Sequence, residues 1–453
     1  MSSSPNIVQV SKFEVLPSNQ PANNTYSFRK GNPIITISIP AQAKYLKPSS
    51  VRINGTLKLN ADGTNALPNN NGLKAGATST FGLSSRVGIH SVFQNVVLSS
   101  EATNQSLEAI RQYGRLVSTI LGSTHTPQDF MTEKSCVAVL NSVEQSSRNL
   151  VNNEIEFSIP LYAGLLQGGQ PIPLSVNGVN GLRVQLELAS DQQVLSGTDA
   201  GAAAGSFYEL KNISLSGDLL VPDEAGVAQL SVAGSGGFEY NSWSSLYSVI
   251  NSSDSTQTYN LANSQVLSVV HTFLPVNQSN SYAADGFATP PLRLSDGAGN
   301  YNADATLKRV SFSRGGVKLG LDYEMDCEQQ SADNVPETQV MMNFLNAFQP
   351  VNSLSRMLNS KQLMSFGGND LVPFLPINRA SNRQVGESFD ARRNFGIGLA
   401  MDRVSNVGVN FKGQSYSSRI VSGLDGNSPN AVFTFILSKN MLRYSPQGIQ
   451  IMT

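Results

Sequence analysis

Apolar and polar positions alternate with a period of two along most of this chain. In residues 51–60, Val51, Ile53, Leu57 and Leu59 fall on one face of an extended strand, with an interruption at Gly55. Similar short runs, separated by Gly, Pro, Asn and Ser, indicate a protein made mainly of strands. The runs expected to form strands are 34–39, 50–60, 90–98, 136–140, 153–161, 181–189, 208–221, 247–251, 258–261, 266–274, 307–325, 396–402, 407–413, 417–424 and 431–440.

Two stretches instead show the spacing of three to four residues that is typical of an amphipathic helix. The first is Leu107–Leu121, which would place Glu108 and Arg111 one turn apart on its polar side. The second is Pro336–Phe348, whose proline is tolerated in a first turn. Each follows about the fourth or fifth strand of its half. The order of elements therefore predicts two similar halves, each a sandwich of about eight strands with one inserted helix.

The pattern also predicts where the halves begin and end. The apolar positions of the first 30 residues are too sparse for a core, so this arm should become ordered only by lying against another surface. Residues 223–237 show no periodicity and read as a linker. The expected divisions are an arm 1–30, a first half 31–222, a linker 223–237, a second half 238–445 and a tail 446–453.

Two local irregularities are expected within the strands. The apolar positions of 208–221 change register near Asn212, which predicts a β-bulge there. Gly315 and Gly316 are a two-residue turn signal and predict a hairpin.

The composition narrows the choice of partners. Only 14% of the residues are charged, and 31 basic against 32 acidic residues give a net charge of −1. Such a chain has no field to draw it onto nucleic acid or an anionic membrane, so no sequence-specific nucleic-acid partner is expected. A nearly neutral surface instead tolerates close association between copies of the chain.

The chain reads as one made for a reducing compartment and not for secretion. Cys136 and Cys327 are far apart and imply no disulfide framework. The first residues lack the basic and apolar regions of a signal peptide, and no apolar run is long enough to span a membrane. Without export, the Asn-x-Ser/Thr triplets at Asn54, Asn212 and Asn251 would not be glycosylated.

The residues that catalysis requires do not gather in the sequence. His90, His125 and His271 lie in separate segments without metal-ligand spacing, and each is expected to be an ordinary packed or surface histidine. No Gly-x-Ser-x-Gly turn presents a serine nucleophile. We therefore expect no enzyme, and no catalytic, cofactor or metal site.

One acidic run needs separate consideration. Carboxylates alternate with other side chains at Asp322, Glu324, Asp326 and Glu328. On a strand they would share a face but stand about 7 Å apart, too far to converge on one ion. A solvated face, paired with Lys308, Arg309, Arg314 or Lys318, is favoured, while a bound cation or a salt bridge between subunits stays open.

A basic run lies in an irregular stretch and consists of Arg379, Arg383, Arg392 and Arg393. A groove for single-stranded nucleic acid would need aromatic residues interleaved with them, and only Phe389 and Phe395 are close. Charges that meet a neighbouring subunit are the favoured interpretation.

Several passages resemble the double jelly-roll major capsid proteins of eukaryotic double-stranded DNA viruses, most closely those of polinton-like viruses and virophages. They are IHSVFQNVVLSS followed by LEAIRQYGRLVSTIL, NEIEFSIPLYAGLLQGGQPIPL with GLRVQLELA, and RVSFSRGGVKLGLDY. The resemblance covers most of residues 30–440 in architecture, while only these passages are similar in letters. It implies an all-β fold of two consecutive eight-stranded jelly rolls, each with one inserted helix.

The resemblance also implies a function in assembly. Three copies would form a pseudo-hexagonal capsomer of an icosahedral shell, with penton and minor or cement proteins as further partners. Loops 61–80 and 277–305 would be outward towers. The arm and the tail would lie near the inner face, next to other capsomers, minor proteins or lipid. The protein would be made in the host cytoplasm or nucleus and end in the virion. The helices Leu107–Leu121 and Pro336–Phe348 would occupy equivalent places, related by a rotation near 60°.

Two other functions remain open at this point. A minor vertex or penton protein would generally need only one jelly roll. A carbohydrate-binding or carbohydrate-cleaving β-sandwich would need an exposed aromatic platform or two carboxylates across a cleft. The chain has a single tryptophan, Trp243, which counts against the second of these.

Overall fold

The computed structural model describes the greater part of the chain. The described residues are 7–60, 74–75, 79–84, 87–124, 154–176, 178–197, 205–231, 237–282, 286–287, 294–295, 301–302, 307–319, 325–326, 343–344, 346–348, 350, 377–378, 383–384, 396–401, 408–423, 429–445 and 448–452.

The first half of the chain forms strands with short helices between them. Its strands are β1 Ile7–Val15, β2 Thr25–Tyr26, β3 Ile34–Ile39, β4 Tyr45–Leu46, β5 Arg52–Asn60, β6 Lys74–Ala75, β7 Ser79–Leu83, β8 Phe93–Ser100, β9 Ser106–Arg111, β10 Glu154–Pro160, β11 Ile172–Pro173, β12 Leu182–Leu188, β13 Leu195–Gly197 and β14 Phe207–Pro222. Its helices are η1 Pro48–Ser50, η2 Gly88–Val92, α1 Tyr113–Thr124, α4 Gly164–Gln167 and α5 Asp191–Val194.

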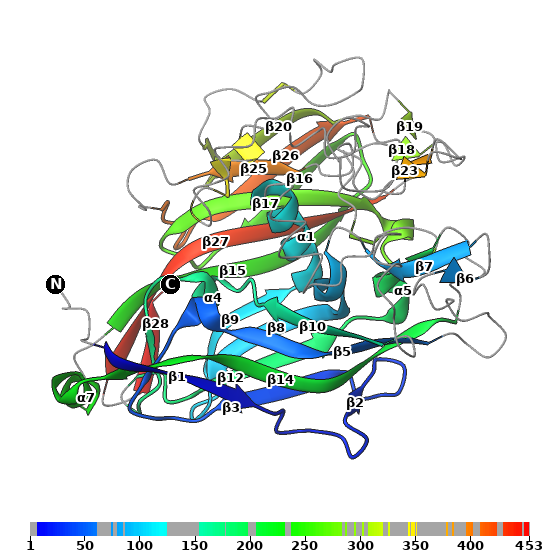
Figure 1. The fold of residues 1–453 in the computed structure, drawn as a ribbon. Helices are drawn as coiled ribbons and strands as arrows, with labels where there is room; N and C mark the ends of the chain where they lie inside the picture. The colour runs from blue at the N-terminus through cyan, green and yellow to red at the C-terminus, as the bar shows by residue number, and fades with distance from the viewer. Residues whose placement is uncertain are drawn as a thin grey trace.

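The second half follows the helix α7 Glu224–Ser231 and is again mostly strands. They are β15 Gly237–Ile250, β16 Asp254–Asn260, β17 Val266–Pro275, β18 Leu294–Ser295, β19 Tyr301–Asn302, β20 Leu307–Arg314, β21 Val317–Lys318, β22 Met325–Asp326, β23 Ile377–Asn378, β24 Arg383–Gln384, β25 Ile397–Ala400, β26 Ser415–Ser422, β27 Asn430–Ser445 and β28 Gly448–Met452, with the 3-10 helix η5 Val276–Gln278. Figure 1 shows the two halves one above the other, with α1 between them.

Eight strands in each half of the described chain pair in the same order. In the first half they are β1, β3, β5, β8, β9, β10, β12 and β14, and in the second they are β15, β16, β17, β20, β22, β25, β26 and β27. In both halves the eighth strand lies between the first and the third, and the third also pairs with the sixth. The seventh lies between the second and the fourth, and the fourth also pairs with the fifth. This antiparallel order is that of a jelly roll, and it occurs twice.

Burial follows the alternation seen in the sequence. Along β12 the side chains alternate between buried and more exposed, because one face of its sheet packs on the core. Every residue of β17 from Val266 to Leu274 is buried, so this strand is covered on both faces. The expectation of a mainly β protein in antiparallel sheets is confirmed.

The helix predicted over Leu107–Leu121 is wrong in its first part. Residues 106–111 form β9, which pairs with β8, and α1 begins only at Tyr113. Between them Gln112 has a φ of 57°, in the left-handed region, so the backbone changes direction at this residue. Leu107 and Ile110 are buried by the sheet, and their spacing of three residues therefore does not reflect a helical turn. The strand expected over 90–98 begins only at Phe93, because residues 88–92 form η2.

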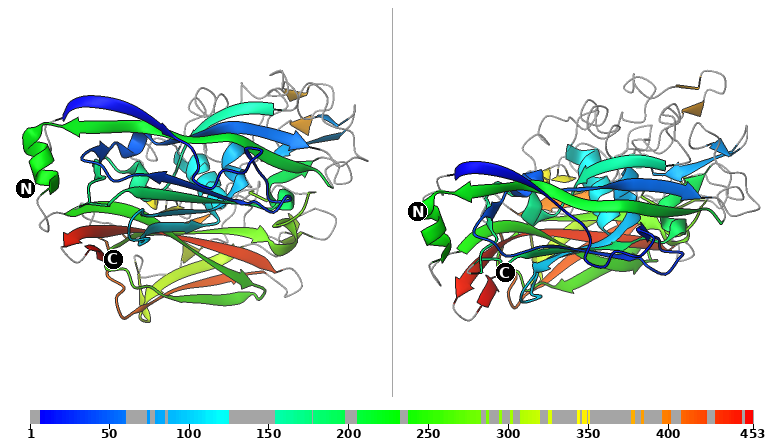
Figure 2. Two further views of the ribbon diagram at one scale, coloured as in Figure 1. Left: turned by 90° about the horizontal axis from the view of Figure 1, so that it is seen from below. Right: turned by 60° about the horizontal axis from the view of Figure 1, so that its bottom comes forward.

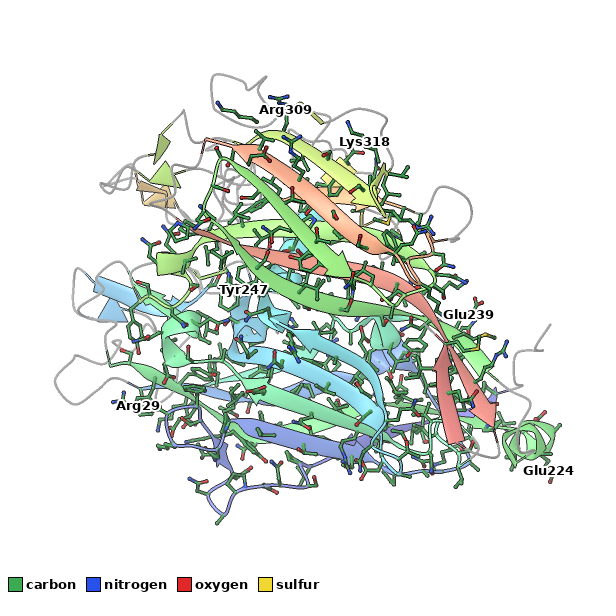
Figure 3. The ribbon with its side chains drawn as sticks, turned by 180° about the vertical axis from the view of Figure 1, so that it is seen from behind. Arg29, Glu224, Glu239, Tyr247, Arg309 and Lys318 are labelled. Carbon is green, nitrogen blue, oxygen red and sulfur yellow. The ribbon has the colours of Figure 1, made fainter. Side chains whose placement is uncertain are left out.

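The expected arm and linker take on regular structure. Residues 7–15 form β1, which lies along β14 as the border strand of the first jelly roll, so this part of the arm is indeed ordered against another surface. Residues 224–231 of the expected linker form α7, and 448–452 of the expected tail form β28, which pairs with β27. The beginning of β1, α7 and β28 gather at one end of the molecule, while Arg309 and Lys318 lie on the far side of the second jelly roll (Figures 2 and 3).

Both predicted irregularities are confirmed. The pairing of β14 with β5 shifts register between Lys211 and Ser214, and Asn212 has a φ of 52°. Its side-chain oxygen accepts a hydrogen bond from Asn24 at 2.7 Å. Gly315 and Gly316 have φ values of 53° and 85° and join β20 to β21, as the two-residue hairpin turn requires.

Candidate functional site

The charged runs singled out in the sequence lie largely outside the described residues. Of the acidic run, Asp322, Glu324 and Glu328 are outside, while Asp326 lies on β22 opposite Arg309 of β20. Of the basic run, Arg379, Arg392 and Arg393 are outside, and Arg383 lies on β24. Among the described residues no group of three His, Cys, Asp or Glu side chains could hold a metal ion. No helix in the same part of the chain is long and apolar enough to span a bilayer.

The two described histidines are packed inside the jelly rolls, as the sequence predicts. His90 is buried in η2, with Nδ1 3.3 Å from the Tyr113 hydroxyl. His271 lies between the two sheets of the second jelly roll, with Nδ1 2.8 Å from Thr434 Oγ1 and Nε2 2.7 Å from the Tyr416 hydroxyl. Burial lowers the pKa of His271 to about 3, so the ring is neutral and links β17 and β27 to β26 by hydrogen bonds.

The most distinctive polar site of the described chain is the seam between the two jelly rolls. Helix α1 belongs to the first, yet every residue from Tyr113 to Leu121 is buried because α1 also packs against the second. The Arg115 guanidinium carbon is 4.2 Å from the centre of the Phe433 ring of β27, a cation–π contact. Phe287 packs against the same helix beside Gly114, and its ring centre is 5.7 Å from the Arg115 guanidinium carbon. The seam is therefore an internal interface.

Glu108 of β9 is the polar centre of this seam and is only 4% exposed. Its Oε1 accepts hydrogen bonds from the backbone N–H of Gly164 at 2.9 Å and of Trp243 at 2.7 Å. Its Oε2 accepts one from the N–H of Leu165 at 2.9 Å. One carboxyl group thus joins β9 and α4 of the first jelly roll to β15 of the second. Close by, the Tyr240 hydroxyl donates to the carbonyl oxygen of Leu107 at 2.8 Å.

The surroundings of Glu108 shift its ionisation. Burial raises the pKa of Glu108 to about 7, against the opposing effect of the three N–H donors. No cation is among the groups that act on it. Tyr113 and Tyr240 face the carboxyl group, and burial raises the pKa of both phenols above the ordinary value of 10. Glu108 is therefore the group at the seam that titrates near neutral pH.

The position assigned to Glu108 from the sequence is wrong. The helical interpretation placed it on a solvated face beside Arg111, whereas only Arg111 is exposed. The donors lie 56, 57 and 135 residues away in the chain, so no local pattern could have indicated them. Residues 106–111 carry no clear strand alternation, because Ala109 and Ile110 are adjacent apolar residues.

Gly164 allows the two jelly rolls to approach at this point. A Cβ at this position would overlap the carbonyl group of Asn241 on β15, which is backbone and cannot rotate away. We expect Gly164→Ala to reduce the free energy of unfolding by about 1–3 kcal/mol through overpacking. Urea unfolding followed by Trp243 fluorescence would measure this change. Gly169→Ala is the matched control, because a Cβ there meets nothing within 4 Å, and equal effects of the two changes would contradict the close approach.

The repeated strand order defines the class of fold, a double jelly roll, and solved structures share it over the whole chain. The PBCV-1 protein VP54, fitted into a reconstruction of the virophage Sputnik, matches with a TM-score of 0.56 and 11% identity, covering 100% of this chain and 98% of that one. The Faustovirus major capsid protein matches with 0.56 and 10% identity, covering 98% and 92%. The Sputnik virophage structure matches with 0.50 and 9% identity, covering 100% and 90%. No family model and no curated protein sequence matches the chain.

Proposed function

We propose that this chain is a structural major capsid protein, which assembles with copies of itself into the shell of an icosahedral DNA virus. The observation that carries the proposal is the double jelly roll, which agrees with major capsid proteins from one end of the chain to the other. Such a protein acts through large contacts between copies and needs no reactive pocket. The buried packing of His90 and His271 fits a structural role better than a catalytic one.

The finer form of the proposal is a trimer with a pseudo-hexagonal outline. Two similar jelly rolls in one chain give three copies six similar units around one axis, and heterologous contacts close the ring. Penton and minor capsid proteins would join these trimers into the shell, and the virion would be the protein's destination. The two jelly rolls expected from the sequence, with towers at 61–80 and 277–305, belong to the same proposal, and β1 counts as the first strand of the first jelly roll.

The carbohydrate-binding alternative loses its best candidate residue. Trp243 is 2% exposed, and its backbone N–H is bound to Glu108 at the seam, so it offers no platform to a sugar ring. A minor vertex protein with one jelly roll does not match the repeated strand order of this chain.

The test is the assembly state of the purified chain. We expect a species of three copies, about 3 × 48.4 ≈ 145 kDa, in light scattering coupled to size-exclusion chromatography. Negative-stain images of that fraction should show particles with three-fold symmetry and a near-hexagonal outline. A chain that stays at 48.4 kDa at every concentration and salt would contradict the proposal.

A further inference from the structure

The first and third strands of each jelly roll lie in the same sheet. One face of this sheet packs on the core of its jelly roll, and we call the opposite face its outer face. In the second jelly roll this sheet is β15, β27, β17 and β25. Thr434 of β27 faces inward, because it bonds His271 between the sheets, so Phe433 and Phe435 on either side of it face outward. These outward side chains are apolar, and each is at most 3% exposed.

The chain itself covers part of this second outer face. Arg115 of α1 lies over Phe433, and Trp243 packs at 6.4 Å from Phe348. A Cβ on Gly398 of β25 would come within 2.9 Å of Ala347. The first jelly roll, through α1, and the segment around Phe348 together bury the part of this face that holds Phe433 and Trp243. Tyr247 and Val249 of β15 share the face and are 55% and 44% exposed.

The corresponding sheet of the first jelly roll is β1, β14, β5 and β10, and its outer face is of the opposite character. Inward residues such as Ile53 and Leu215 pair across the strands, and so do the outward Arg52 and Ser216. The outward side chains include Lys12, Glu14, Asn54, Thr56, Glu156 and Ser158. This sheet forms the side of the molecule turned away from the second jelly roll (Figure 2, left).

These polar side chains are tied to one another across all four strands. Ser214 donates to Glu14 at 2.6 Å, Asn54 to Ser216 at 2.9 Å, and Ser158 to Asn54 at 2.7 Å. At the end of this row, Nε of Arg52 donates a hydrogen bond to the Ser158 hydroxyl at 3.0 Å. Because the side chains are already held in place, a partner would immobilise few further rotamers on binding.

We propose that this first outer face is the surface onto which the second jelly roll of another copy docks. The inference rests on the proposed function and deepens it. Within one chain, the first jelly roll covers part of the outer face of the second. In the assembly, the second jelly roll of one copy would pack in the same way on the outer face of β1, β14, β5 and β10 of the next copy. These contacts are heterologous, and three of them close into a ring.

The contrast between the two outer faces fits this assignment. The part of the second face that is covered within the chain is buried from the moment of folding, so it can be apolar. The face covered by another copy must first be exposed to water in the single chain, and a polar face keeps that chain soluble. At its border Val10 is 56% exposed and pairs with Leu220, which adds an apolar margin to the docking surface.

The test places two arginines on the docking surface. Thr56→Arg/Glu156→Arg adds bulk and raises the net charge by three where β5 and β10 pair, at a half-buried and an exposed position respectively. Gln185→Arg/Glu187→Arg is the matched control, with the same charge change on the outward side of β12 in the other sheet. We expect the first variant to be folded and monomeric, and the control to form trimers like the unaltered chain.

The outcomes separate the docking surface from the proposed function. Trimers of the first variant, or equal loss of trimers in the control, would overturn the docking surface and leave the proposed function intact. An unaltered chain that never forms trimers would overturn the proposed function. If the first variant does not fold, Cys136 and Cys327 are replaced by serine and a single cysteine is placed at Glu156. A maleimide should label it in the monomer and not in the trimer, while Glu187→Cys is labelled in both, and equal labelling in the trimer would overturn the docking surface.

Discussion

Glu108→Ala is expected to lower the free energy of unfolding by about 3–5 kcal/mol. The change leaves the backbone N–H groups of Gly164, Leu165 and Trp243 without their acceptor. A buried donor that loses its partner costs about 1–3 kcal/mol, and the three costs overlap because one relaxation can serve more than one group. Since the donors come from both jelly rolls, the substitution should weaken the contact between the two jelly rolls at the seam.

Trp243 makes this loss measurable. It is the only tryptophan of the chain, and its own N–H is one of the three donors, so its fluorescence during urea unfolding reports on the seam. Glu108→Gln retains an acceptor oxygen and should lose less than the alanine variant. Glu187→Ala, at an exposed position of β12, should stay within about 0.5 kcal/mol of the unaltered chain. A Glu108→Ala protein as stable as that control would show that water or other groups satisfy the three donors.

The pH dependence of stability should show two buried groups acting in opposite directions. The folded-state pKa of Glu108, about 7, lies above the ordinary 4.5, so the folded chain holds a proton that the unfolded chain has lost. Stability from Glu108 is therefore full below pH 4.5 and falls by about 3 kcal/mol as the pH rises to 7. His271, with a pKa of about 3 against 6.5, does the reverse, and its contribution is lost as the pH falls from 6.5 towards 3.

Between pH 4.5 and 6.5 the two slopes cancel, so single variants are needed to reveal them. The stability difference between the unaltered chain and Glu108→Gln should shrink by about 3 kcal/mol as the pH rises from 4.5 to 7. The difference from His271→Asn should shrink by about 3 kcal/mol as the pH falls from 6.5 to 4.5. Urea titrations at several pH values measure both, and other titrating groups cancel in each difference. Curves that run parallel to that of the unaltered chain would contradict the assignment.

The strands were the part of the fold most open to prediction. Alternation is a local property, because successive side chains of a strand point to opposite faces. Ile53 and Leu57 therefore share a face, and both are buried. The turn at Gly315 and Gly316 was also predictable, because glycine readily adopts positive φ values. The bulge at Asn212 was predictable because the apolar positions of 208–221 change register there. The helix boundary was not, since Leu107 and Ile110 are three residues apart, a spacing that fits one face of a helix but places the two side chains on opposite faces of a strand.

The seam was beyond the reach of the sequence for a different reason. Glu108 beside Arg111 looked like an ordinary surface pair, and nothing near it in the chain distinguishes it from one. Glu108 is buried because α4 and β15, which are distant in the sequence, pack against it, and because Gly164 has no side chain that would prevent this packing. The candidate charges at Asp322 and Arg379 lie outside the described residues, so their roles stay predictions.

The sequence by itself determined that the chain is mainly β, that its elements occur twice in the same order, and which side chains of most strands point inward. These properties depend on residues a few positions apart, where backbone geometry links one residue directly to the next. Only the tertiary structure decided that residues 106–111 extend as β9, that Glu108 joins the two jelly rolls, and that one outer face is partly covered by the chain while its counterpart is polar. Those outcomes depend on segments far apart in the chain, such as those of Glu108 and Trp243 or of Arg115 and Phe433, and packing between them outweighs local preference.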